Sequence, residues 1–151
     1  MKTQHFDIFI NAPRRHVWTT MLQPASYEKW TAAFCEGSCF EGSWDQGSKI
    51  RFLGPEGPEG GGMVAEIAEH RPGEFVSIRH LGVIQDGVED TTSEAIKAWA
   101  PCYEKYTFTD EAGGTRLKVD SDVFGDHEAF MAETWPRALA RLKAVCEGKS
   151  V

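Results

Sequence analysis

Hydrophobic spacing predicts one long amphipathic helix at the end of the chain, from Asp126 to about Cys146. Apolar and small side chains recur there at intervals of three and four positions, which marks one wide apolar stripe. The stripe consists of Phe130, Thr134, Trp135, Ala138, Leu139, Leu142 and Val145. A single helix cannot bury such a stripe in itself, so it needs a sheet to pack against.

The chain before this helix has the pattern of short strands separated by glycine and proline turns. Turns are expected at 45–47, 54–62 and 71–73, because glycine supplies positive φ and proline fixes its own φ. The expected strands cover residues 5–10, 38–44, 49–53, 63–69, 74–82, 103–109 and 115–123. Their short connections favour an antiparallel meander.

Two short helices are expected directly after the first strand. Asn11 precedes Pro13, so its side chain is placed to cap the first helix. Apolar residues at helical spacing mark the two helices, namely Val17, Trp18, Met21 and Leu22, then Tyr27, Trp30 and Phe34. The element order predicts an α+β fold in a single domain, residues 1–151, in which a curved antiparallel sheet of about six to seven strands grips the C-terminal helix.

The segment from Gln85 to Ala100 is an acidic insertion between two expected strands. Thr91 and Glu94 have the spacing of a capping box, followed by Ile96 and Trp99 on a short helix. We predict that Ile96 and Trp99 fold over a cavity mouth as a lid. A dimer contact through the same two residues and a disordered loop are the alternatives.

Composition narrows the classes of partner. The chain has 151 residues, 41% of them hydrophobic, and a net charge of −7, which disfavours nucleic acid and anionic membrane as partners. No apolar run is long enough to span a membrane. Residues 1–7 lack the apolar core of a signal peptide, so we expect a cytoplasmic protein with its four cysteines reduced.

The sequence predicts neither a metal site nor a cofactor. Its five histidines are dispersed, and Cys35 and Cys39 lack a second ligand pair at zinc spacing. Gly60-Gly61-Gly62-Met63-Val64-Ala65 matches a dinucleotide fingerprint but opens a strand where that motif requires a helix. No P-loop lysine and no G-x-S-x-G elbow occur.

Alternation on the strand near residue 104 indicates a candidate site. Cys102, Glu104, Tyr106 and Phe108 share one face, so Glu104 lies among apolar neighbours. It is therefore a candidate acid, base or ligand anchor, unless it pairs with Arg or Lys at a cavity mouth. His80 is a second candidate. The predicted cavity residues are Trp30, Phe34, Trp44, Phe52, Ile78, His80, Glu104, Tyr106, Phe108, Phe130 and Trp135.

Four stretches carry a family resemblance, namely Ile10-Asn11-Ala12-Pro13 with Val17-Trp18, residues 62–67, Thr115-Arg116-Leu117 and residues 135–143. They resemble the SRPBCC superfamily (START-like, birch-pollen-allergen-like), and most of all the bacterial group named after the activator of the heat-shock-protein ATPase. The resemblance implies a helix-grip fold over nearly the whole chain. Members of the superfamily bind lipids, steroids or polyketides, and some cyclise aromatic polyketides.

Three functions follow in order of preference. The first is binding of a small apolar or amphipathic molecule between sheet and helix, by a monomer or homodimer. The second is an enzyme of the cyclase or dehydratase kind, with His80 or Glu104 as acid or base. The third is a chaperone-associated interaction domain, which rests on the group's name alone. No catalytic motif of the group carries over.

Overall fold

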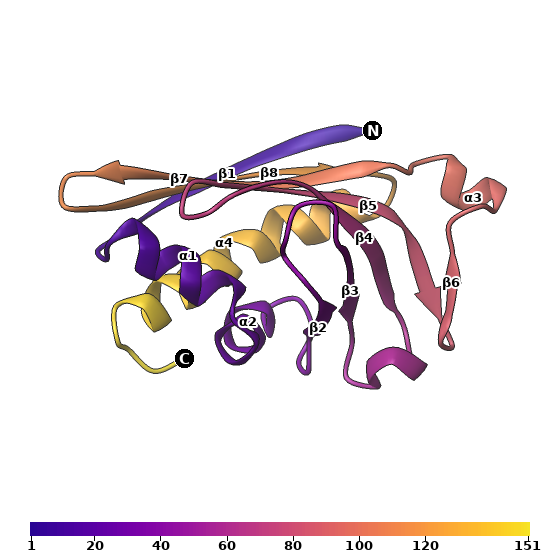
Figure 1. Cartoon of the computed structure of the whole chain (residues 1–151), viewed down its shortest axis with the longest axis horizontal. Helices are drawn as coiled ribbons and strands as arrows, with labels where there is room; N and C mark the ends of the chain where they lie inside the picture. Colours follow the sequence, from indigo (N-terminus) through magenta and orange to yellow (C-terminus); the bar gives the residue numbers. More distant parts are fainter.

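The computed structural model describes residues 1–151 and confirms the α+β helix-grip fold (Figure 1). Strands and helices follow the predicted order, with one further short strand and one 3-10 turn, Gly57–Glu59. The elements are β1 (Lys2–Ile10), α1 (Arg14–Leu22), α2 (Pro24–Thr31), β2 (Cys39–Gly42), β3 (Lys49–Leu53), β4 (Gly62–Arg71), β5 (Phe75–Gln85), β6 (Val88–Asp90), α3 (Glu94–Lys97), β7 (Cys102–Glu111), β8 (Gly114–Val123) and α4 (His127–Cys146).

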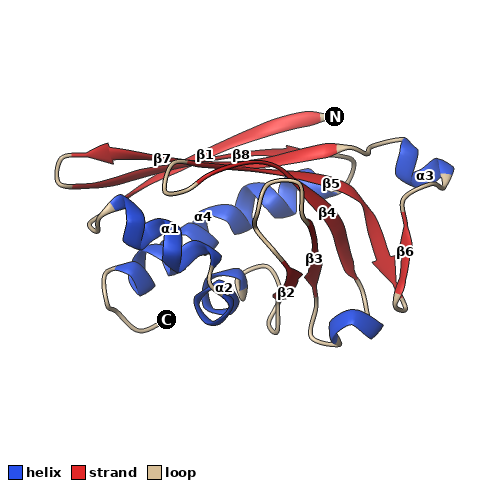
Figure 2. Ribbon diagram, in the orientation of Figure 1, coloured by secondary structure: helices blue, strands red, loops and turns tan.

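All strands belong to one antiparallel sheet in the order β1-β8-β7-β5-β4-β3-β2, and β6 pairs with β5. The sheet curves around α4, while α1 and α2 lie beside α4 on the same side (Figure 2). Strand β6 is not among the predicted strands, because three residues are too few to show alternation. It forms a hairpin with β5 through Asp86 and Gly87, whose φ angles of 51° and 79° suit a two-residue turn.

The pairing of β4 with β5 is interrupted twice, and both interruptions leave one residue without an opposite partner. Val64 lies opposite Gly82 and Ala65 lies opposite His80, so Leu81 is the extra residue on β5. Ala68 is the extra residue on β4, between the pairs of Ile67 and Glu69. Such bulges increase local bend and twist.

The expected cap on α1 is wrong. The helix begins at Arg14, and Pro13, with an extended backbone, occupies the N-cap position without a side-chain hydrogen bond. Asn11 lies two residues too early to reach the first turn. Its backbone N–H instead donates to Glu147 Oε2 at 2.9 Å, which ties the start of α1 to the end of α4.

The expected capping box on α3 is also wrong. Ser93 is the N-cap residue, and its hydroxyl oxygen accepts from the Ile96 N–H at 3.4 Å. Asp90 organises the preceding turn, because its Oδ1 accepts from the N–H groups of Thr92 and Ser93 at 3.2 and 3.0 Å. This turn places the cap two residues after Thr91.

The core lies between the concave face of the sheet and α4. The buried part of the helix stripe includes Trp135, Ala138, Leu139 and Leu142. They belong to one hydrophobic cluster with residues of α1, α2 and the sheet. Phe130, at the N-terminal end of the stripe, is 48% exposed, and Val145 near its C-terminal end is half-buried. No helix of the structure combines the length and apolarity needed to cross a membrane.

Candidate functional site

Space remains between the sheet and the N-terminal half of α4, in two adjoining compartments. The first has a volume of about 220 Å³ and the second of about 230 Å³. They share four residues, Met63, His80, Glu104 and Met131. The first is otherwise lined by Tyr27, Trp30, Thr31, Phe34, Ser38, Phe52, Tyr106 and Trp135, and the second by Cys102, Ser121, Asp122, Val123, Phe124, His127 and Phe130.

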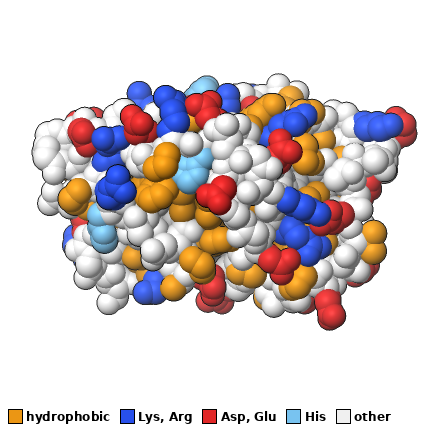
Figure 3. Space-filling model, in the orientation of Figure 1, with side chains coloured by type: hydrophobic (Ala, Val, Ile, Leu, Met, Phe, Trp, Pro, Cys, Tyr) orange, Lys and Arg blue, Asp and Glu red, His pale blue; other side chains and the backbone are white.

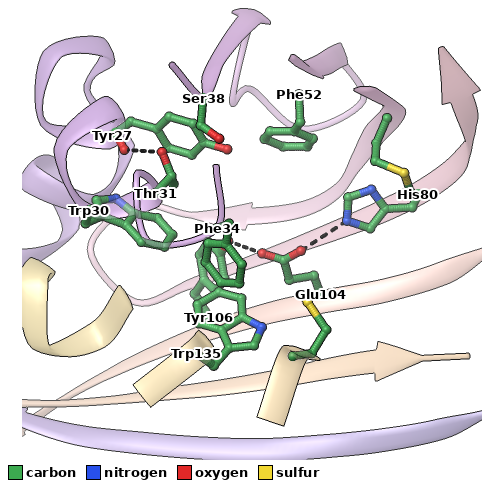
Figure 4. A pocket seen from close by; sticks show the side chains of 12 residues that line it. Tyr27, Trp30, Thr31, Phe34, Ser38, Phe52, His80, Glu104, Tyr106 and Trp135 are labelled. Atoms are coloured by element: carbon green, nitrogen blue, oxygen red, sulfur yellow. Dashed lines mark hydrogen bonds and ion pairs between the residues drawn. The ribbon is translucent and has the colours of Figure 1, made fainter. Parts of the chain in front are cut away.

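Three polar side chains, His80, Glu104 and Tyr106, line the first compartment as a connected group (Figure 4), and two of them, His80 and Glu104, also line the second. Glu104 Oε1 is 3.2 Å from His80 Nε2, and Glu104 Oε2 accepts a short hydrogen bond from the Tyr106 hydroxyl. The Glu104 side chain is 19% exposed and that of His80 is 10% exposed. Glu104 therefore pairs with a histidine and a tyrosine, and the alternative of an Arg or Lys partner is wrong.

Strand register explains why these side chains meet. Glu104 lies opposite Ile78, and His80 lies opposite Cys102, so His80 and Glu104 are diagonal neighbours across β5 and β7. Diagonal neighbours on one face of an antiparallel pair lie within reach of long side chains. Tyr106 is two residues beyond Glu104 on the same face of β7. The Leu81 bulge directly follows His80, and a bulge bends the strand that carries it.

The connected side chains of His80, Glu104 and Tyr106 can hold a proton at a defined place. Ionised Glu104 accepts from both neighbours, with the Tyr106 O–H on one oxygen and the His80 Nε2–H on the other. In the neutral tautomer that carries its hydrogen on Nε2, His80 has a lone pair on Nδ1, and this atom is buried without a partner in the protein. A proton on Nδ1 would convert the same pair into a buried ion pair.

The negative charge of Glu104 influences the groups around it. Burial, and after it the Glu104 carboxylate, raises the pKa of Tyr106 well above its usual value, and the pKa of Tyr27 moves in the same direction for the same two reasons. Burial followed by Glu104 and Asp122 raises the pKa of the Cys102 thiol to about 12. These hydroxyl and thiol groups therefore stay neutral around the carboxylate.

Most of the aromatic side chains singled out from the sequence surround the polar side chains of His80, Glu104 and Tyr106. The first compartment brings together Trp30, Phe34, Phe52, His80, Glu104, Tyr106 and Trp135, and Phe130 lines the second. Ile78 and Phe108 do not line either compartment, because both are packed within the hydrophobic core. Trp44 does not line them either. Its ring packs on that of Phe40, with 5.4 Å between the ring centroids, and it borders a separate groove beside Trp18.

Several lining residues are missing from the sequence-based set. Tyr27 precedes Trp30 and Phe34 at helical spacing, and Met131 lies four residues before Trp135 on α4, so periodicity was sufficient to include both. Alternation along residues 115–123 places Ser121 on the inward face with Leu117 and Val119, so it could also have been included. Met63 and Asp122 had no such indication. Phe124 and His127 lie at the junction between β8 and α4, outside both periodic patterns.

The insertion reaches the second compartment through one aromatic contact. Trp99 stacks on Phe124 with a centroid distance of 4.7 Å and an interplanar angle of 4°, and Phe124 lines that compartment. Phe124 also contacts the ring of His127 at 5.2 Å. The Ile96 side chain is buried, since only 5% of the residue is exposed. The lid function of Ile96 and Trp99 stays a prediction.

The architecture is the helix-grip fold of the SRPBCC superfamily, as the sequence resemblance implied. The family model described as "Activator of Hsp90 ATPase homolog 1-like protein" matches residues 11–147, and the chain belongs to this family. A comparison with curated protein sequences gave no match.

Solved structures similar to this chain have low sequence identity and share the fold. The Aha1 dimer from Colwellia psychrerythraea is 17% identical with a TM-score of 0.72, and the alignment covers 100% of both chains. DynU16, a protein of the dynemicin biosynthetic locus, is 18% identical with a TM-score of 0.71 over 98% of this chain but 48% of its own. CalU16 from Micromonospora echinospora is 15% identical with a TM-score of 0.65, over 97% of this chain and 76% of its own.

Proposed function

We propose that the protein binds a small apolar or amphipathic molecule between the sheet and α4, with Glu104 as the polar anchor. The observation that carries this proposal is the His80–Glu104–Tyr106 chain in a cavity lined mainly by aromatic side chains. Ligand sites in proteins combine an apolar lining with a few convergent polar groups that fix orientation.

Size supports a ligand that extends through both compartments. Each compartment alone, at about 220 or 230 Å³, is smaller than the ~300 Å³ at the lower end of ordinary ligand pockets, whereas both together fall within that range. Such a ligand would place its middle beside Glu104, which the compartments share. The four free cysteines support our further proposal that this binding takes place in the cytoplasm.

Titration with the neutral dye N-phenyl-1-naphthylamine tests binding. We expect a saturable rise in dye fluorescence, and a loss of at least tenfold in affinity in the variant Ser38→Phe, which places a ring in the first compartment. Ser150→Phe adds the same ring at an exposed position near the C-terminus and should bind like the parent protein. Non-saturable fluorescence, or equal binding by Ser38→Phe, would contradict the proposal.

A second candidate function is proton-transfer catalysis of the dehydratase or cyclase kind. The 3.2 Å contact between His80 and Glu104 favours it, because a histidine oriented by a carboxylate is a common acid–base unit. A panel of β-hydroxy ketones tests it, since dehydration produces an enone with its own ultraviolet absorbance. His80→Gln should abolish the reaction while dye binding persists. A rate equal to that of buffer across the panel would eliminate this candidate.

The structure adds no support for a chaperone-associated role. Such a role needs a contiguous exposed apolar patch. Only four large apolar side chains are exposed, namely Met1, Val88, Phe130 and Val151. On the face drawn in Figure 3, apolar side chains are interspersed with charged groups of both signs.

A further inference from the structure

The cavity holds negative charge without a basic side chain to balance it. Glu104 and Asp122 are the acidic residues of its lining, and no lysine or arginine lines either compartment. Lys105 follows Glu104 on β7, but its side chain is exposed and its ammonium lies over the Tyr103 ring at 5.4 Å. His80 and His127 are the remaining groups there that can become cationic.

Aromatic rings surround the carboxylate in the first compartment, as Figure 4 shows. Trp135 is at the centre of this group, 5.0 Å from Phe34, 5.9 Å from Trp30 and 6.2 Å from Tyr106 between ring centroids. Phe52 lies 5.7 Å from the His80 ring. Aromatic ring faces carry partial negative charge and attract cations within about 6 Å, most strongly where water is excluded.

Glu104 keeps the capacity to bind a further donor. A carboxylate offers about four lone-pair sites, and the contacts to His80 and Tyr106 occupy one on each oxygen. Part of the side chain is also exposed to the cavity. A ligand N–H group can therefore approach Glu104 without displacing either protein partner.

We propose that the ligand carries an organic ammonium group, seated on Glu104 among the aromatic rings of the first compartment, with an apolar body that extends along the cavity. This inference rests on the proposed binding function and names the chemical class of its ligand. A carboxylate ligand would instead be buried beside Glu104 with no basic side chain to pair with, which is costly. A neutral ligand would leave the lone pairs of Glu104 without a charged partner.

The Glu104 carboxylate also creates a negative field at the groups around it. It contributes to the raised pKa of Tyr27, Tyr106 and Cys102, after the larger effect of burial. A field that disfavours phenolate and thiolate favours an ammonium ion at the same place.

Calorimetric titration of three naphthalene derivatives with the same ring tests the inference. We expect 1-naphthylmethylamine, an ammonium ion at pH 7, to bind at least tenfold more tightly than neutral 1-naphthalenemethanol, and 1-naphthoate to bind most weakly. In Glu104→Gln, which keeps a side chain able to bond to Tyr106 and His80, the amine and alcohol should bind within threefold of each other. Glu133→Gln removes one charge from the exposed face of α4 and should keep the parent preference.

Two further readouts keep the outcomes distinct. Phe52→Leu should weaken the amine more than the alcohol, because it removes a ring and keeps an apolar side chain; this variant decides the matter if Glu104→Gln does not fold. Alcohol binding equal to or tighter than amine binding would overturn the ammonium inference and leave the proposed function intact. Absence of binding by all three compounds, and by the dye, would overturn both.

Discussion

At the scale of single residues, Glu104 connects two strands of the sheet. One oxygen bonds to Tyr106 on its own strand and the other contacts His80 on β5, so the carboxylate fixes two side chains that line the cavity. Hydrogen bonds to charged groups contribute more to stability than neutral ones, and a buried polar group that loses its partner destabilises the fold. The polar chain should therefore affect both stability and binding.

Tyr106→Phe should lower the free energy of unfolding by about 1.5–3 kcal/mol, because Glu104 loses a donor that no other side chain replaces. Tyr103→Phe is the matched control on the same strand, since Tyr103 bonds to the Asp122 side chain through its backbone N–H, which the substitution keeps, and it should change stability by less than about 0.5 kcal/mol. Urea denaturation measures both. Equal midpoints for the two variants would show that the Tyr106–Glu104 bond contributes nothing to stability.

Alkaline pH should destabilise the fold. Burial raises the pKa of Cys102 to about 12 and that of Cys146 to about 11, while an unfolded thiol titrates near 9. Above pH 9 the unfolded chain releases these protons and the folded chain keeps them, so stability falls as pH rises, by about 1.4 kcal/mol per pH unit for each group. Urea midpoints from pH 7 to 10.5 should stay level and then drop. Cys102→Ala should flatten the drop, and an unchanged slope in that variant would contradict this assignment.

At the scale of elements, α4 was predictable and its surroundings only in part. The predicted helix from Asp126 to Cys146 differs from the observed one by a single residue, because a long stripe averages over many positions. Helix starts depend on one or two backbone torsions, so the caps at Asn11 and Thr91 were wrong. The α+β class and helix-grip architecture followed from element order, and β6 was too short to be recognised.

Trp135→Ala should destabilise the protein by about 3–5 kcal/mol, since it removes a ring that is 1% exposed beneath α4. Phe130→Ala on the same helix removes a half-exposed ring and should cost about 1 kcal/mol or less. Thermal and urea unfolding measure the difference between the two variants. A shift for Trp135→Ala no larger than that for Phe130→Ala would mean that the ring is not part of the core.

At the scale of the whole molecule, the cavity depends on contacts between elements far apart in the sequence. Alternation identified Glu104, and the aromatic content indicated a pocket. The diagonal approach of His80 and Glu104 comes from strand register, which spacing along one chain does not specify. Spacing along the chain also could not separate cavity residues from core residues. Ile78 and Phe108 share faces with His80 and Glu104, but both belong to the hydrophobic core.

The insertion should respond to occupancy of the cavity. Hydrogen exchange of residues 94–100 should slow when the neutral dye binds, because Trp99 stacks on Phe124 at the border of the second compartment. Trp99→Ala should remove this response and speed dye release. Exchange that slows with protein concentration alone would favour a dimer contact through the same residues. Rapid exchange unchanged by dye and by concentration would contradict both lid and dimer.

The two bulges between β4 and β5 have a consequence for how this cavity can change. Leu81 and Ala68 are surplus residues in the pairing of these two strands, and such residues bend and twist the strand that carries them. Deleting one of them should restore regular pairing and straighten the sheet at that place. The distance between the sheet and α4 should then change, although every side chain that lines the cavity is still present. We therefore expect the volume of the cavity to depend on the number of residues in β4 and β5 as well as on their type, so that single-residue insertions and deletions there offer a route to new ligands that substitutions do not provide.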